Sequence, residues 1–192
     1  MIFLASASPR RQEILKTAGF DFEICPMDID EDSITGKDKE ELVMNLAKAK
    51  AIACRDFLAT SGKISDSDII VGSDTLVFAD GKPLGKPADK KQWEEYIRLL
   101  QGKDHEVITG VALIKAEHIK TFYSTTTVSV SNMTDKEIHQ FIARNEDMDK
   151  AGGYAIQGYF SQYINKISGE YNNVVGFPIA KFRQEVQLDP FS

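Results

Sequence analysis

A carboxylate inside an apolar stretch is the first candidate for chemistry in this 192-residue chain. Short apolar runs flank Asp74 over residues 68–78 and predict a strand that is buried on both faces. A carboxylate in an apolar site costs several kcal/mol unless it is paired or bound to a metal, and the adjacent Ser73 and Gly72 leave room for a ligand beside the backbone. The alternative is that Asp74 marks a bend where the strand reaches the surface. We favour the chemical interpretation.

Two adjacent arginines form the second candidate. Ser8 has the chemistry of an N-cap residue and Gly19 ends the apolar pattern, which predicts a helix over about residues 9–18. Arg10 and Arg11 in its first turn oppose the helix dipole, at a cost of about 0.3–1 kcal/mol each. A bound anion removes this conflict, because backbone N–H groups, serine hydroxyls and guanidinium groups then converge on it. Two solvated surface arginines are the alternative, and we favour a phosphate site.

Three further segments could complete such a site. The acidic run 28–32 contains Glu31 and offers the oxygen ligands that Mg²⁺ takes beside phosphate, although acidic loops are usually solvated. Lys50 falls on or beside the apolar stripe of a predicted helix over residues 40–58, where it either extends to water or enters a phosphate cleft. Lys86 lies between a glycine and a proline, in a stiffened loop.

The segment 146–158 is too rich in glycine for a helix and too long for a turn. Loops of this kind carry function disproportionately often. Gln157 within it can both donate and accept hydrogen bonds, as the recognition of a base edge requires. The sequence therefore predicts a ligand-binding loop here.

Composition and charge exclude several classes of function. The chain has 42% hydrophobic and 27% charged residues, which suits a globular protein of one domain or of two lobes that share a sheet. A net charge of -6 argues against nucleic-acid binding, and no apolar run is long enough to span a bilayer. Cys25 and Cys54 are too few for a disulfide scaffold, so we expect reduced core thiols in a cytoplasmic protein.

Strand and helix patterns alternate along the chain and must position these residues. A tight hairpin is predicted at Asp80-Gly81, and Thr134 with Glu137 has the pattern of a capping box. The other predicted strands are residues 2–4, 20–25, 107–114, 119–130 and 163–167, and the other helices begin at Asp89, at Thr134 and at about residue 179.

Six short motifs occur in order over nearly the whole chain, from about residue 2 to residue 182. They are residues 4–11, 46–51, 72–75, 85–87, 149–158 and 174–178. Any one alone is weak, but six in order at the right spacing are highly specific. In these motifs the chain resembles the Maf family of nucleoside triphosphate pyrophosphatases.

The resemblance implies an α/β fold, with a long bent mixed sheet, flanking helices and two lobes around a central cleft, as in the inosine triphosphate pyrophosphatases. A single domain over residues 1–192 is expected. The implied activity is hydrolysis of dTTP and UTP to the nucleoside monophosphate and pyrophosphate, with Mg²⁺ or Mn²⁺ as the cofactor. The implied cellular role is the removal of non-standard nucleotides. We expect a cytoplasmic homodimer whose partner is a nucleoside triphosphate rather than a nucleic acid or a membrane.

The resemblance also implies roles for single residues. Asp74 is the expected proton acceptor, Glu31 assists the metal or the water, and both are expected metal ligands. The sequence leaves open whether Asp74 takes the proton or mainly binds the metal. The expected triphosphate-binding residues are Ser8, Arg10, Arg11, Lys50 and Lys86, and the positions that separate the dTTP/UTP branch from the 7-methyl-GTP branch are Arg10, Thr75 and Gln157.

The chain departs from the family pattern at Gly153, at Gln101-Gly102 and at Phe177, and one rival function remains. Gly153 stands where the family more often has Ala or Ser, which could loosen the base-binding loop. The rival is a nucleotide-binding regulator of cell division, or septum formation, whose hydrolysis is incidental. The carboxylate of Asp74 argues against this regulator, because simple anion binding does not need an acid. The sequence also lacks a GxxxxGK[ST] segment, which argues against a P-loop enzyme.

Overall fold

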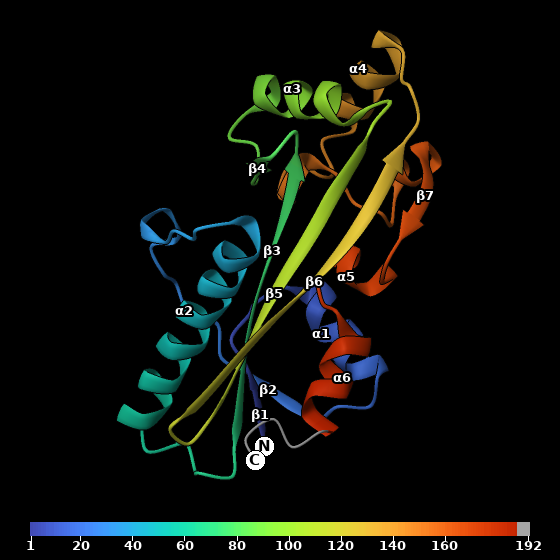
Figure 1. Ribbon diagram of the computed structural model, residues 1–192. Helices are drawn as coiled ribbons and strands as arrows, with labels where there is room; N and C mark the ends of the chain where they lie inside the picture. Colours follow the sequence, from blue (N-terminus) through green and yellow to red (C-terminus); the bar gives the residue numbers. More distant parts are fainter. Residues whose placement is uncertain (188–192) are drawn as a thin grey trace. The chain divides into compact units, whose positions relative to one another are not determined.

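Seven strands form one mixed sheet in the computed structural model, which describes residues 1–187 (Figure 1). The sheet order is β2-β1-β3-β5-β6-β7, and β4 pairs with β3 outside this path. Neighbours β1–β2 and β1–β3 are parallel, whereas β3–β4 and β6–β7 are antiparallel. The strands are β1 (Ile2–Leu4), β2 (Phe22–Ile24), β3 (Ile69–Ala79), β4 (Lys82–Leu84), β5 (Asp104–Lys115), β6 (His118–Val130) and β7 (Ile164–Ser168).

Six α-helices and three short 3₁₀ helices accompany these strands in the described part of the chain. The α-helices are α1 (Pro9–Thr17), α2 (Lys39–Thr60), α3 (Lys90–Leu100), α4 (Asp135–Arg144), α5 (Tyr171–Val175) and α6 (Ile179–Gln187). The 3₁₀ helices are η1 (Glu31–Ser33), η2 (Ala151–Gly153) and η3 (Tyr159–Tyr163). The predicted α/β fold with a mixed sheet and flanking helices is confirmed. Within residues 1–187 no helix is both long and apolar enough to cross a membrane.

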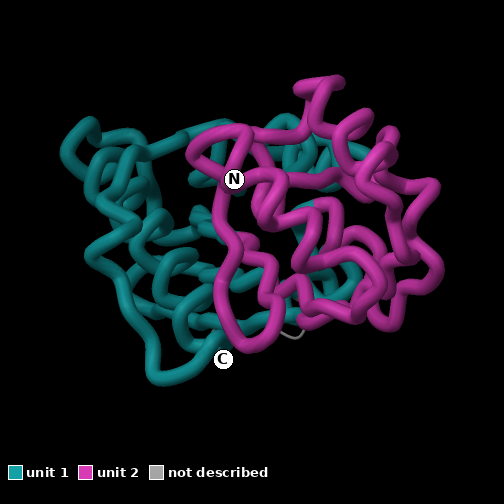
Figure 2. Tube along the Cα trace, turned by 90° about the horizontal axis from the view of Figure 1, so that it is seen from above, with its two compact units in different colours: residues 1–74, 109–124, 176–192 teal, residues 75–108, 125–175 magenta. Residues whose placement is uncertain are grey.

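The chain divides into two compact units (Figure 2). Unit 1 contains residues 1–74, 109–124 and, among those described, 176–187, and unit 2 contains residues 75–108 and 125–175. Strands β3, β5 and β6 each contribute residues to both units. The single domain over residues 1–192 and the cleft between two lobes stay predictions, and the part of that range after residue 187 lies outside the described residues.

In unit 1, helix α2 lies directly on the sheet because two glycines leave space for its backbone. A Cβ atom added at Gly72 would lie 2.1 Å from the carbonyl oxygen of Ala47, and one at Gly110 would lie 2.2 Å from that of Val43. The core beneath includes Cys25 and Cys54, which are buried free thiols, as the sequence predicts.

Unit 2 has its own core, in which α3 and α4 pack together. The ring of Trp93 meets that of Phe141 edge-on, with centroids 5.3 Å apart. Asp89 caps α3 by accepting from the backbone N–H of Gln92, and Thr134 opens α4 with the predicted capping box.

A buried polar pair also lies within unit 2. The Nε2 atom of His105 and the hydroxyl of Tyr154 are 2.6 Å apart, and both side chains are almost fully buried. Burial lowers the pKa of His105 from its ordinary value of 6.5 to about 4, because the charged imidazolium is poorly solvated there. His105 is therefore neutral near pH 7.

The contact at Gly110 predicts that Gly110→Ala destabilises the fold. The added methyl group must push α2 off the strand, which should lower the free energy of unfolding by about 1–3 kcal/mol. Gly85→Ala is the control, since nothing lies within 4 Å of a Cβ atom added there. Urea denaturation of both variants gives the comparison, and equal stability would contradict the close approach of α2.

The neutral imidazole of His105 predicts a pH dependence of stability. Its folded-state pKa is below its ordinary value, so the unfolded chain takes up a proton between pH 6.5 and about 4 that the folded chain does not. Stability from this residue is thus complete above pH 6.5 and falls toward pH 4, by up to about 1.4 kcal/mol per pH unit.

Denaturation across this pH range should show a weaker slope in His105→Gln than in the native protein. His118→Gln, which changes an exposed histidine of β6, is the matched histidine control. Parallel slopes for all three proteins would show that His105 does not titrate in this way.

Candidate active site

The centre of the candidate site in unit 1 is a lysine between two carboxylates. The Nζ atom of Lys50 donates to Oδ1 of Asp74 at 2.5 Å and lies 2.8 Å from Oε1 of Glu31. Asp74 is only 7% exposed, whereas the Glu31 side chain on η1 is 55% exposed. Lys50 therefore joins a buried acid to one that water can reach, and its own side chain, 14% exposed, does not extend into bulk solvent.

Strand and helix geometry explain this meeting. Gly72 and Asp74 are two residues apart on β3 and so point to the same face of the sheet. The missing side chain of Gly72 admits the turn of α2 that contains Ala47 and Ala51. Lys50 lies in this same turn, which directs its ammonium toward Asp74.

The corner between β1 and α1 lies beside the same strand. β1 pairs in parallel with β3, with Leu4 opposite Val71, and the N–H of Ala5 donates to the carbonyl of Val71 at 2.9 Å. The chain after β1 therefore continues next to the residues that follow Val71, which lead to Asp74. This register brings the start of α1 to the acid.

Arg11 is partly buried at this corner and is held there by two hydrogen bonds. Its Nε donates to the carbonyl oxygen of Gly176 at 2.9 Å and its Nη1 to the hydroxyl of Ser6 at 3.1 Å. Burial lowers the pKa of Arg11, the carboxylate of Asp74 raises it, and the charge of Arg10 lowers it. Arg11 is thus within electrostatic reach of the acid.

The candidate residues Ser8 and Arg10 lie in the same corner. Ser8 is the N-cap residue of α1, but its hydroxyl makes no capping hydrogen bond; its backbone N–H instead donates to the hydroxyl of Ser6 at 3.2 Å. Arg10 is partly exposed in the first turn. Without a capping role, the hydroxyl of Ser8 is available to a ligand at the helix N-terminus.

Ser6 is a residue that the sequence did not single out. Its hydroxyl accepts from both Arg11 and the backbone of Ser8, so it fixes the shape of the corner. The only signal in the sequence is a small polar residue at the end of a strand, which many turns share. Gly176 lies in the motif of residues 174–178, but its role was not predicted, since it contributes a backbone carbonyl and no side chain.

The remaining candidate residues belong to unit 2. Thr75 follows Asp74 along β3 and points to the opposite face of the sheet. Lys86 and Gln157 are exposed on two segments that a backbone hydrogen bond connects, from the N–H of Gly152 to the carbonyl of Gly85 at 3.0 Å. The structure therefore gathers Glu31, Lys50, Asp74 and the α1 corner in one unit, and ties Lys86 to the Gln157 segment in the other.

The donors suit a divalent metal that also binds phosphate. The carboxylates of Asp74 and Glu31 both reach the same ammonium, so their oxygens converge on one region. Mg²⁺ commonly takes one or two carboxylates and completes its shell with water and substrate phosphate. Among the described residues no group of three or more His, Cys, Asp or Glu could hold a metal by itself.

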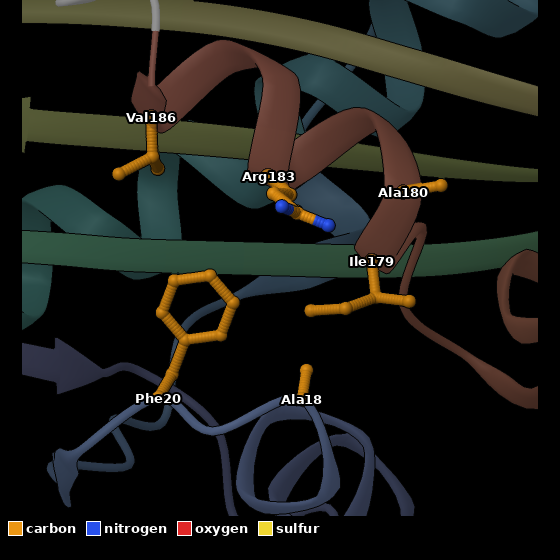
Figure 3. A pocket seen from close by; sticks show the side chains of 6 residues that line it. All are labelled: Ala18, Phe20, Ile179, Ala180, Arg183 and Val186. Carbon is orange, nitrogen blue, oxygen red and sulfur yellow. The ribbon is translucent and has the colours of Figure 1, made fainter.

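A cavity of about 620 Å³ lies elsewhere in unit 1, between the end of α1 and helix α6 (Figure 3). None of the candidate residues lines it. Its wall is mostly apolar with one arginine, formed by Ala18, Phe20, Ile179, Ala180, Arg183 and Val186.

Comparison with known proteins adds independent information. Residues 1–188 match the family model described as Maf-like protein. A relative from Bacillus anthracis named dTTP/UTP pyrophosphatase is 41% identical over 187 residues, which cover 97% of this chain and 94% of the relative. A relative of the same name from Bacillus mycoides is 40% identical over 186 residues, with the same coverage.

Among solved structures, the Ham1 protein of Staphylococcus aureus aligns with 85% of this chain and 79% of its own, at 16% identity and a TM-score of 0.46, a likeness too low to support an argument. The match to the family model spans nearly the whole chain and agrees with the curated relatives. The chain belongs to the Maf family.

Proposed function

We propose that the chain is a nucleoside triphosphate pyrophosphatase that hydrolyses dTTP and UTP to the nucleoside monophosphate and pyrophosphate. The observation that carries the proposal is the buried acid Asp74, paired with Lys50 beside an arginine-bearing helix N-terminus. Relatives with 40% and 41% identity bear the name dTTP/UTP pyrophosphatase, which supports the same activity and the same bases.

In the proposed reaction a water oxygen forms a bond to the α-phosphorus while the bond from that phosphorus to the bridging oxygen breaks. Pyrophosphate leaves with the bridging oxygen. Asp74 accepts the proton of the attacking water, and its hydrogen bond to Lys50 fixes the direction of the carboxylate. A metal ion held by Asp74 and Glu31 would neutralise charge on the triphosphate.

The basic residues bind the phosphates. Arg10, Arg11 and the hydroxyl of Ser8 surround the N-terminus of α1, where free backbone N–H groups also favour an anion. In unit 1, Lys50 adds a third positive charge to those of Arg10 and Arg11. Lys86 of unit 2 is the remaining proposed phosphate-binding residue. The leaving pyrophosphate is stabilised by this positive charge, since its own negative charge increases as the bond breaks.

Base selection is assigned to Thr75 and Gln157, with Arg10 as the third position that separates the family branches. Gln157 is exposed directly after the buried residues 152–156 and offers both a donor and an acceptor to a base edge. We further propose Mg²⁺ or Mn²⁺ as the cofactor, a homodimeric state and a cytoplasmic location.

The role of Asp74 predicts the effect of Asp74→Asn. The amide keeps the shape and an oxygen acceptor for Lys50 but cannot accept the proton, so kcat should fall by about 10²–10⁴-fold with the fold intact. Pyrophosphate release in the presence of Mg²⁺ measures this, and the native protein should prefer dTTP and UTP over CTP and 7-methyl-GTP.

Asp56→Asn is the matched control, because Asp56 is an exposed acid of α2 that pairs only locally with Arg55. It should retain full activity. Full activity of Asp74→Asn would remove the assignment of that acid, and tight nucleotide binding without product by the native protein would favour the regulator instead.

Removal of divalent metal should abolish turnover of dTTP. Chelation with EDTA leaves the triphosphate charge uncompensated, and added Mg²⁺ or Mn²⁺ should restore pyrophosphate release. Glu31→Gln should raise the metal concentration needed for half-maximal activity, since one of the two proposed ligand oxygens loses its charge. Undiminished activity in EDTA would exclude the proposed cofactor.

A further inference from the structure

The segment that carries Gln157 is anchored to the core of unit 2 by the single tryptophan of the chain. Trp93 lies on α3 and is fully buried. Its indole Nε1 donates a hydrogen bond to the backbone carbonyl of Gly153. The donor comes from a rigid side chain that packs edge-on against Phe141, so its position is set by the core.

The two glycines of the segment let its backbone rest directly on that core. A Cβ atom added at Gly153 would lie 2.4 Å from Cδ1 of Trp93, and one at Gly152 would lie 2.9 Å from Cγ2 of Val77. Both glycines have positive φ, at 69° and 72°. The hydrogen bond to Trp93 therefore holds a backbone that has no side chain between it and the indole.

The anchor extends to the segment that carries Lys86. The N–H of Gly152 donates to the carbonyl of Gly85 at 3.0 Å, and the position of a Cβ atom at Gly153 lies 3.5 Å from Cγ of Pro87. Lys86 stands between Gly85 and Pro87. Its backbone is thus held on both sides, by Gly152 and by Gly153, and Gly153 is the glycine that contacts Trp93.

Burial along the segment shows where the anchor ends. Residues 152–156 are buried, and the hydroxyl of Tyr154 adds the bond to His105, whereas Gln157 is exposed. Lys86 is exposed in the same way on its own segment. The exposed side chains of Gln157 and Lys86 are therefore both attached to backbone that packs on the core of unit 2. A rigid support of this kind is needed to place ligand-binding groups precisely.

We propose that Trp93 is a positioning residue for nucleotide recognition. Its indole N–H fixes Gly153, and through Gly153 it sets the places of Gln157 and Lys86, and hence base selectivity and affinity for the triphosphate. Trp93 itself does not touch the nucleotide. The inference rests on the proposed function, in which Gln157 and Lys86 contact the substrate.

Trp93→Phe tests the proposal, because phenylalanine keeps an aromatic ring in the core and removes the N–H donor. It also reduces the buried volume, so a control for lost packing is needed. The KM for dTTP should rise about tenfold, because the carbonyl of Gly153 loses its buried hydrogen-bond donor and the segment no longer holds Gln157 and Lys86 in place. The kcat should stay within about twofold of the native value. The preference for UTP over CTP, as a ratio of kcat/KM values, should fall about fivefold or more. An unchanged KM and an unchanged preference would overturn the proposal.

Phe141→Leu is the matched control for packing. It removes the ring that contacts Trp93 but keeps the indole donor, so stability should decrease while KM and the preference for UTP stay native. The same kinetic losses in Phe141→Leu would mean that only core packing matters, and would overturn the role of the hydrogen bond.

Hydrogen–deuterium exchange gives a measurement that does not depend on turnover. Amides of residues 149–158 and 82–87 should exchange faster in Trp93→Phe than in Phe141→Leu, and equal exchange would overturn the anchoring. If the native protein releases no pyrophosphate from any nucleoside triphosphate, the proposed function fails, whereas a difference in exchange still supports the anchor. The two failures are therefore distinguishable.

Discussion

The ion pair between Lys50 and Asp74 is the interaction on which the candidate site of unit 1 depends. A buried carboxylate without a partner costs several kcal/mol, and the ammonium from α2 removes most of that cost. The lysine reaches the acid only because Gly72 lets the helix approach the strand. If α2 lay further from the sheet, Lys50 could not pair with Asp74. The glycine at position 72 and the lysine at position 50 are therefore required together.

Much of the fold follows from signals that act over a few residues. The capping box at Thr134 and the hairpin at Asp80-Gly81 each fix an element locally, and the structure has α4 and the β3–β4 turn where these signals predict them. Helix α1 also begins after Ser8 as predicted, although the Ser8 hydroxyl makes no capping hydrogen bond. Helix α5 was not predicted, because five residues are too few to show a helical period.

The site was harder to predict, because its contacts join distant parts of the chain. The apolar pattern placed Lys50 at the edge of the apolar face of α2. It could not show whether the ammonium extends to water or enters a phosphate cleft, because the hydrogen bond to Asp74 depends on how α2 packs on the sheet. Ser6 and Trp93 escaped notice for a related reason. Each acts on the backbone or on another side chain, and composition gives no sign of such a role.

The division of the chain has a consequence for how such a protein can evolve. Neither unit is a continuous stretch of sequence, and the boundary at Asp74 and Thr75 falls inside one strand. Recombination at a single point in the gene cannot exchange one unit for that of a relative, because strands β3, β5 and β6 would be cut or mismatched. Exchange of a whole unit would instead require several crossovers, at the breaks inside β3, β5 and β6 and at the break after residue 175.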